Sequence, residues 1–97
     1  MPRQVVFRPQ AEDEVIEVRQ WYEARRPGLG KDFAAAVDQV IERILANPFA
    51  FPRAQAETRR AVLSRFPYAV YFRSLDEEIV VLAVHGRRHP RRWQTRS

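Results

Sequence analysis

The spacing of apolar residues in the first half of the chain predicts a strand followed by two helices. Residues 4–8 (QVVFR) are short and β-rich, and Pro9 ends the run, which is typical of a first strand. Two sets of apolar residues then recur in steps of four, three and four, as one helical face requires. The sets are Ala11, Val15, Val18 and Tyr22, and Phe33, Val37, Val40 and Ile44. Residues 25–30 (RRPGLG) separate the two predicted helices and Pro48 ends the second, so we expect an antiparallel helical hairpin.

The second half changes to a period of two, which indicates strands. Residues 59–66 (RRAVLSRF) have mixed faces, and residues 66–73 (FPYAVYFR) alternate apolar and other positions. Residues 74–78 (SLDEE) predict a turn, and residues 79–84 (IVVLAV) are apolar on both faces, as in a central strand. The predicted order is β-α-α-β-β-β. The expected fold is α+β, with the helical hairpin packed on one face of a small antiparallel sheet.

Four apolar residues lie away from the predicted helical stripes. At 100° per residue, Trp21 is about 90° and Ile16 about 130° from the centre of the first stripe. On the second helix, Ile41 is about 60° and Leu45 about 100° off centre. These residues fit either the edges of a broad core or a groove that takes a partner helix.

Length and composition predict one globular domain over residues 1–97, because 45% of the residues are hydrophobic. The chain has no cysteine, which excludes disulfides and thiolate sites and is compatible with the cytoplasm. The longest apolar run, residues 79–84, is far shorter than the ~20 residues of a membrane span. The N-terminus lacks the apolar core of a signal peptide. We therefore expect a cytoplasmic protein without a membrane partner.

The positive charge is concentrated in the second half of the chain. Seventeen basic and 12 acidic residues give a formal net charge of +5. Residues 85–97 contain five arginines and no acidic residue, and residues 53–73 contain five arginines and one glutamate. Two basic blocks suggest a surface for an anionic partner, and charge alone does not choose among nucleic acid, an acidic protein segment and a membrane surface.

Few residues offer chemistry of their own. Phosphate-binding glycine loops and nucleophile elbows are missing from the sequence. His85 and His89 have a helical ligand spacing, but Gly86 and Pro90 make a helix there improbable, so we expect no metal and no cofactor. The acidic clusters at residues 11–14 (AEDE) and 76–78 (DEE) look like a helix N-terminus and a turn rather than paired catalytic carboxylates.

The remaining candidates are basic and aromatic. They are Arg59, Arg60, Arg65, Arg73, His85, Arg87, Arg88, His89, Arg91, Arg92 and Trp93. If the strands are neighbours, arginines and a histidine could converge to bind phosphate. With a proton-transfer residue such as His85, the group could also cleave RNA. A base would take the proton of the attacking 2′-hydroxyl, arginines would stabilise the charged phosphorane, and an acid would protonate the leaving oxygen. Equally, the arginines could be solvated or bind an acidic protein.

The ordered set of these signals resembles the RelE/ParE superfamily of toxins from bacterial type II toxin–antitoxin systems. The resemblance rests on the helix AEDEVIEVRQWYE, the turn RPGLG, the second helix ending at NP, the run RRAVLSRFPYAVYFR, and IVVLAV followed by HGRRHPRRW. It covers essentially the whole chain. It implies a cytoplasmic toxin that a cognate antitoxin neutralises, and it favours Ile16, Trp21, Ile41 and Leu45 as antitoxin-binding residues.

The superfamily contains two activities, and the fold does not choose between them. ParE-like members inhibit DNA gyrase, whereas RelE-like members cleave mRNA in the ribosome. This chain has no tyrosine after Tyr71, where RelE-like nucleases tend to place a catalytic group, and HGRRHP resembles the ParE-like, plasmid-stabilisation branch. We therefore expect a gyrase inhibitor, with the nuclease as the alternative and a non-toxic nucleic-acid-binding module as a third possibility.

The basic and aromatic residues would have different roles in these activities. For a nuclease, the candidate catalytic residues are Arg65 and His85. In either case we expect a target-binding surface made of Arg60, Arg65, Arg73, His85, Arg87, Arg88, His89, Arg91, Arg92 and Trp93.

Overall fold

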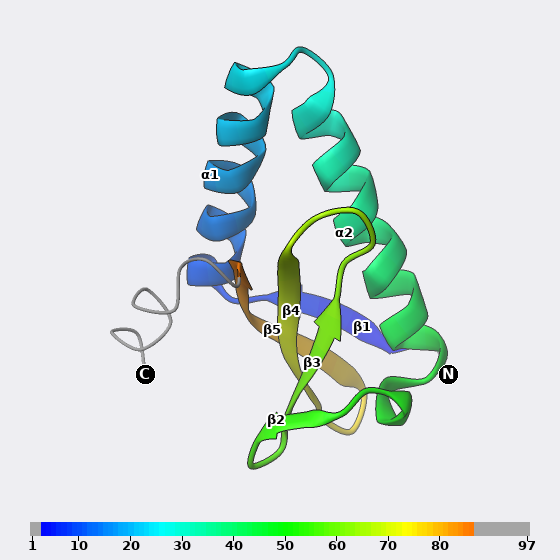
Figure 1. Cartoon of the computed structure of the whole chain (residues 1–97). Coiled ribbons are helices and arrows are strands. Elements are labelled where there is room, and N and C mark those ends of the chain that lie inside the picture. The colour runs from blue at the N-terminus through cyan, green and yellow to red at the C-terminus, as the bar shows by residue number, and fades with distance from the viewer. Residues whose placement is uncertain (1–2, 87–97) are drawn as a thin grey trace.

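The computed structural model describes residues 3–86 of the chain, which form two helices and one sheet (Figure 1). The elements in chain order are β1 (Gln4–Phe7), α1 (Pro9–Arg25), α2 (Leu29–Ala46), the 3-10 helix η1 (Pro48–Ala50), β2 (Arg53–Gln55), β3 (Thr58–Val62), β4 (Tyr68–Ser74) and β5 (Glu78–Gly86). The α+β class and the helical hairpin on a sheet are confirmed.

The sheet has five strands in the order β1-β5-β4-β3-β2, and it is mixed rather than wholly antiparallel. β1 pairs in parallel with β5, from Gln4 beside Glu78 to Phe7 beside Val81. The other pairs are antiparallel, and this was predicted for β3, β4 and β5. The short strand β2 was not predicted. Its three residues are all exposed, so no apolar alternation marks them.

The two helices form a tight hairpin around a glycine turn. Gly28 has a φ of 90°, in the left-handed region that glycine enters without steric cost. The Glu23 carboxylate accepts hydrogen bonds from the backbone N–H groups of Gly28 and Gly30, which lie at the start of α2. A Cβ atom on Gly30 would lie 2.6 Å from the carbonyl oxygen of Arg19, so glycine there allows the helices to approach closely.

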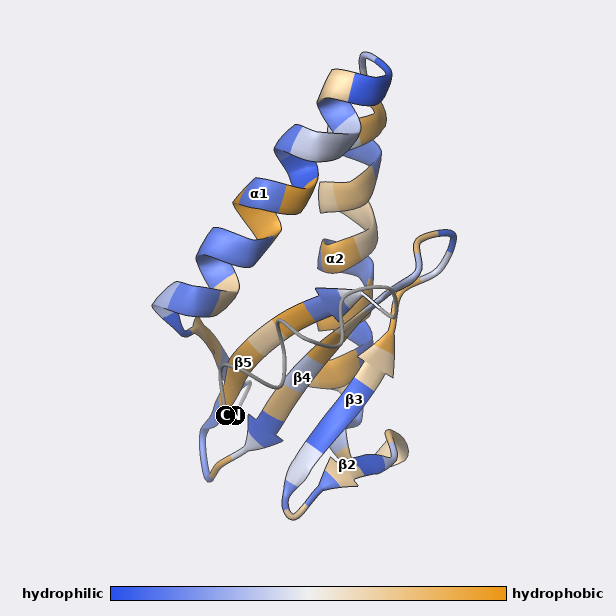
Figure 2. Cartoon of the chain, turned by 60° about the vertical axis from the view of Figure 1, so that its left-hand side comes forward, coloured by the Kyte–Doolittle hydropathy of each residue, from blue (hydrophilic) through white to orange (hydrophobic). Residues whose placement is uncertain are grey.

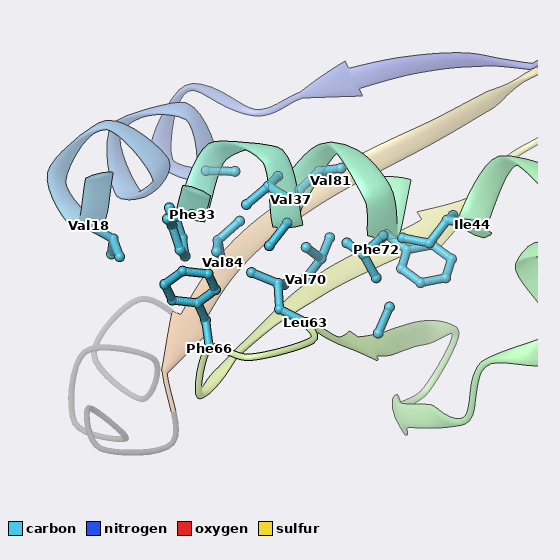
Figure 3. Packing of buried hydrophobic residues seen from close by; sticks show 14 of the residues in the cluster. Val18, Phe33, Val37, Ile44, Leu63, Phe66, Val70, Phe72, Val81 and Val84 are labelled. Atoms are coloured by element: carbon cyan, nitrogen blue, oxygen red, sulfur yellow. The ribbon is translucent and has the colours of Figure 1, made fainter. Parts of the chain in front are cut away.

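The core lies between the hairpin and one face of the sheet (Figure 3). All four predicted stripe positions of α2 are buried, and they pack against apolar residues of β3, β4 and β5. Hydrophobic colours run along most of β5 in Figure 2, as expected for the strand between β1 and β4. The largest fully buried side chains are Phe33, Phe72, Ile44, Ile79, Val40, Val70, Val81 and Val84.

The third strand from the N-terminus, β3, ends earlier than its sequence suggests. The run at residues 59–66 predicted a strand as far as Phe66, but β3 stops at Val62. Arg65 adopts a φ of 71°, which is incompatible with a strand. The backbone N–H of Leu63 donates to the carbonyl of Tyr68 at 2.9 Å and closes the turn into β4.

Within residues 3–86, neither helix is long and apolar enough to cross a membrane.

Candidate functional site

A buried carboxylate from α1 binds the last residues of β5. The ladder between β1 and β5 ends at Phe7 and Val81, where the Arg8 N–H donates to the Val81 carbonyl at 2.9 Å. β5 continues from Val81 to Gly86, and this last part of the strand lies beside α1 instead of β1. There Glu14 Oε1 accepts a hydrogen bond from the Val84 N–H at 2.8 Å, and Glu14 Oε2 lies 3.2 Å from His85 Nδ1. Glu14 thus replaces the missing strand partner and positions the imidazole.

Both members of this pair are interior residues, since Glu14 is 2% and His85 5% exposed. The sequence predicted His85 correctly at the end of the last strand, but it assigned Glu14 only to the acidic N-terminus of a helix. Glu14 lies three residues after Ala11 and four before Val18, so it occupies the apolar face of α1. A polar residue on a buried stripe is the signal that could have identified it.

Several candidate target-binding residues lie on the sheet face opposite the helices. Arg60 pairs across the strands with Tyr71, and Val62 with Ala69, which in turn pairs with His85. Directly paired residues point to the same face of a sheet. The rings of Tyr71 and His85 are 5.8 Å apart. We call this the open face, because neither helix packs on it; it is formed by Thr58, Arg60, Val62, Ala69, Tyr71, Arg73, Val80, Ala83 and His85. Of these residues, Ala69, Val80, Ala83 and His85 are buried.

Arginines on the open face are exposed. Arg73 Nε donates to the Thr58 hydroxyl at 3.1 Å, which places this guanidinium over β3. Arg60 is exposed beside the half-buried Tyr71. Two cations next to a phenol make a surface that can bind phosphate or carboxylate groups.

Two of the other arginines are held elsewhere. Arg65 lies in the turn between β3 and β4, 3.9 Å from Asp32 of α2, with a side chain that is 69% exposed. Arg59 donates to the Phe51 carbonyl at 2.6 Å and lies 5.2 Å from the centre of the Phe49 ring. The two candidate catalytic residues therefore lie beside different helices, Arg65 beside α2 and His85 beside α1.

The four predicted antitoxin-binding residues fall into two environments. Ile16 and Trp21 on α1 are 53% and 50% exposed, whereas Ile41 and Leu45 on α2 are half-buried and pack against the core. Ile16 and Trp21 are separated by five residues, or about 140° around the helix, so they lie on opposite flanks of α1. The Arg25 guanidinium stacks over Trp21 at 4.0 Å from the ring centre.

The remaining predicted target-binding residues lie outside the described part of the chain. They are Arg87, Arg88, His89, Arg91, Arg92 and Trp93. Among residues 3–86, no three histidine or acidic side chains are grouped as a metal ion would require.

Comparison with known proteins identifies the family. The sequence model for the ParE toxin of the type II toxin–antitoxin system parDE matches residues 5–90. The chain belongs to the ParE toxin family. This ParE family member is thus a toxin of a type II toxin–antitoxin system and part of the RelE/ParE superfamily, as its sequence suggested.

Solved structures agree with the fold. A chain of the chromosomal ParDE system from P. aeruginosa matches with a TM-score of 0.76 at 15% identity, over 87% of this toxin and 95% of that chain. A chain of the RelBE2 toxin–antitoxin complex from Mycobacterium tuberculosis matches with a TM-score of 0.59 at 22% identity, over 90% of this toxin and 100% of that chain. Among curated proteins, none matches the sequence.

Proposed function

We propose that this ParE family toxin inhibits DNA gyrase in the cytoplasm by binding it, and that a cognate antitoxin neutralises the toxin. The burial of His85 is the main support. A general base must come within hydrogen-bonding distance of the proton it removes. His85 is 5% exposed and its Nδ1 atom faces Glu14, so its geometry suits support of the sheet better than proton transfer to RNA.

The target surface in this proposal combines the open face with the basic C-terminal sequence. Arg60 and Arg73 contribute exposed guanidinium groups, and β5 leads directly into Arg87 and Arg88. Gyrase binding would then rest on several arginines rather than on one reactive group. Inhibition should accordingly fall in steps as arginines are removed and should weaken at high salt.

Antitoxin binding is proposed for the exposed side chains of α1, Ile16 and Trp21, with Ile41 and Leu45 at the side of α2. Exposed apolar residues on a helix are suited to an apolar partner segment. The two structural relatives from toxin–antitoxin systems support such a partner for this chain.

An mRNA endoribonuclease is the second candidate, and one feature of the open face favours it. Tyr71 lies beside Arg60 and 5.8 Å from the His85 ring, so a phenol, an imidazole and a guanidinium are neighbours. A phenol can transfer protons and arginines can stabilise a phosphorane. This activity predicts that Tyr71→Phe abolishes toxicity without changing folding.

The deciding experiment is induction of the toxin without its antitoxin, followed by parallel pulse-labelling of DNA and protein synthesis. Inhibition of gyrase predicts that DNA synthesis fails first, together with a DNA-damage response. Purified gyrase should lose supercoiling activity in the presence of the toxin, and Arg60→Ala with Arg73→Ala should reduce this effect, whereas Arg19→Ala on the exposed side of α1 should not.

Early failure of protein synthesis would overturn the gyrase proposal in favour of the nuclease. Normal growth, combined with salt-sensitive binding to free DNA or RNA, would indicate a non-toxic nucleic-acid-binding module instead.

A further inference from the structure

Arginine and phenylalanine side chains alternate at the end of the sheet where α2 leads into η1. The guanidinium carbon of Arg3 is 5.5 Å from the centre of the Phe49 ring, and that of Arg59 is 5.2 Å from the centre of the same ring. Arg59 also donates to the Phe51 carbonyl, and the guanidinium carbon of Arg43 is 5.7 Å from the centre of the Phe51 ring. The two rings therefore bring three guanidinium groups together from distant parts of the chain.

Arg53 adds a fourth guanidinium group beside the other three. It is the cross-strand partner of Arg59, and Arg59 in turn pairs with the buried Phe72. Directly paired residues point to the same face, so these arginines lie on the helix side of the sheet and not on the open face. We call the set the arginine–phenylalanine row; its members are Arg3, Arg43, Phe49, Phe51, Arg53 and Arg59.

Hydrogen bonds hold two of the guanidinium groups in place. Arg3 Nη1 donates to the Ser74 hydroxyl at 2.6 Å, and Arg59 Nη1 donates to the Phe51 carbonyl at 2.6 Å. Each guanidinium carries five N–H donors, so further donors remain for an anionic ligand. Side chains that are already positioned lose less conformational entropy when they bind such a ligand.

The positive charge of the row is not neutralised by the toxin's own acidic side chains. All 12 acidic residues of the chain lie within residues 3–86, and none forms an ion pair with any of the four arginines. Arg3 and Arg59 share one ring, so their separation is comparable with the Debye length of about 8 Å and they repel each other. An anion bound between them would relieve this repulsion.

One acidic segment limits the direction from which an anion can approach. The N–H of Gln4 donates to the Glu77 carbonyl at 3.0 Å, which places the acidic turn at residues 76–78 next to the Arg3 end of the row. A polyanion should therefore approach from the Arg43 end.

Phe49 gives the row an exposed aromatic surface. Phe49 is 62% exposed, the highest value among the large apolar residues of the described part of the chain, whereas Phe51 packs against the buried Phe72 ring. An exposed phenyl ring beside two guanidinium groups offers a flat surface next to positive charge. Nucleic-acid bases stack on aromatic rings and on guanidinium planes, while arginines bind the phosphates between the bases.

We propose that the arginine–phenylalanine row binds single-stranded nucleic acid, with one base on the exposed Phe49 ring and neighbouring phosphates on the guanidinium groups. A single strand presents aromatic faces and negative charges in the same alternation as the row. An acidic protein segment would match the arginines but would leave the exposed ring without a stacking partner. The proposal depends on neither gyrase nor the antitoxin, because the row and the open face lie on opposite sides of the sheet.

The first test measures binding of a fluorescein-labelled oligothymidylate of about 12 nucleotides to the full-length toxin by fluorescence anisotropy. Phe49→Leu keeps an apolar side chain but removes the ring, and it should weaken binding about fivefold. An abasic oligomer of the same length has the phosphates without the bases, so the wild type and this variant should bind it equally. Unchanged affinity of Phe49→Leu for oligothymidylate would overturn the proposal.

A second variant tests the phosphate contacts and still decides the question if Phe49→Leu proves unstable. Arg43 is exposed on α2, so Arg43→Gln should preserve the fold. It should weaken binding of both oligomers about three- to fivefold at low salt and reduce the salt dependence by about one phosphate contact. The matched control is Arg19→Gln, at an exposed arginine of α1 outside the row, which should leave affinity unchanged. Equal losses for the two variants would mean general attraction by net charge and would contradict the proposal.

Nuclear magnetic resonance locates the bound strand on the toxin. Titration of oligothymidylate into ¹⁵N-labelled toxin should shift the amide signals of Phe49 and Arg53 in a saturable manner. Shifts confined to Tyr71 and its neighbours would place the strand on the open face and overturn the assignment to the row.

Competition at the Phe49 signal separates nucleic acid from an acidic protein. Oligoglutamate with the same number of charges should displace oligothymidylate only weakly, because it has no base to stack on the ring. Displacement as efficient as that by unlabelled oligothymidylate would assign the row to an acidic protein segment instead. Oligouridylate should compete as well as oligothymidylate, since the row binds phosphates and base faces rather than the 2′-hydroxyl; a strong preference for either would contradict a site with these two chemistries alone.

Discussion

The carboxylate of Glu14 lies 3.2 Å from the imidazole of His85, and the two residues come from positions 71 apart in the sequence. Glu14 also accepts the backbone N–H of Val84. Helix α1 is thereby connected by polar contacts to the end of β5, the strand that leads into the basic C-terminal residues. This buried contact therefore holds α1 against the strand that carries part of the proposed target surface.

Replacement of Glu14 by alanine should destabilise the toxin. The loss is expected to be about 1–3 kcal/mol for each buried group that loses its acceptor, namely the Val84 N–H and His85 Nδ1. Urea denaturation followed by circular dichroism measures it. Asp13→Ala, at the exposed neighbouring position, is the control and should change stability by less than about 0.5 kcal/mol. Similar transition midpoints for the two variants would contradict the structural role of Glu14.

Arg59 and Arg60 are sequence neighbours with opposite roles, because alternate residues of β3 face opposite sides of the sheet. Arg59 donates to the Phe51 carbonyl and lies beside Phe49, so Arg59→Ala should cost about 1–2 kcal/mol of stability. Arg60→Ala should leave stability within about 0.5 kcal/mol of the wild-type value but reduce toxicity. Thermal unfolding and growth assays on both variants check this; equal effects in both assays would show that the two faces are not distinct.

Gly86→Ala should destabilise the end of β5 by about 1–3 kcal/mol, because the added methyl group would meet the Tyr68 ring. Chemical denaturation measures the loss. In a double-mutant cycle, Tyr68→Ala should remove most of this cost, since the ring causes the clash. An additive double mutant would mean that the strain comes from the backbone of β5 instead.

The sequence predicted most of the fold but only part of the site, for physical reasons. The stripe of α2 could be predicted because Phe33, Ile44 and the other stripe positions recur along the sequence with the period of a helix, which is a local signal. The parallel pairing of β1 could not, because it joins Gln4 to Glu78 across both helices. Glu14 was missed because its acceptor role depends on Val84, which lies 70 residues away.

The same limit applies to the faces of the strands. Alternation shows that Arg59 and Arg60 point to opposite sides of β3, but it does not reveal which side faces the helices. That depends on the pairing of Ala61 with Val70, which puts Ala61 in the core and Arg60 on the open face. The local sequence pattern gives the alternation of side chains along a strand, and long-range packing decides which of the two sides faces the helices.

Ile16 and Trp21 lie on opposite flanks of α1, and both are expected to contact the antitoxin. If the antitoxin surrounds α1, alanine at either position should weaken antitoxin binding, and the two losses should add within about 0.5 kcal/mol because the side chains share no contact surface. Calorimetry on both single variants and the double variant measures this, with Glu12→Ala as the exposed control on the same helix. An antitoxin that binds only one flank would be affected by only one substitution. If Ile16→Ala alone weakened binding, the antitoxin would lie on the Ile16 flank of α1 and the assignment of Trp21 to its interface would be wrong.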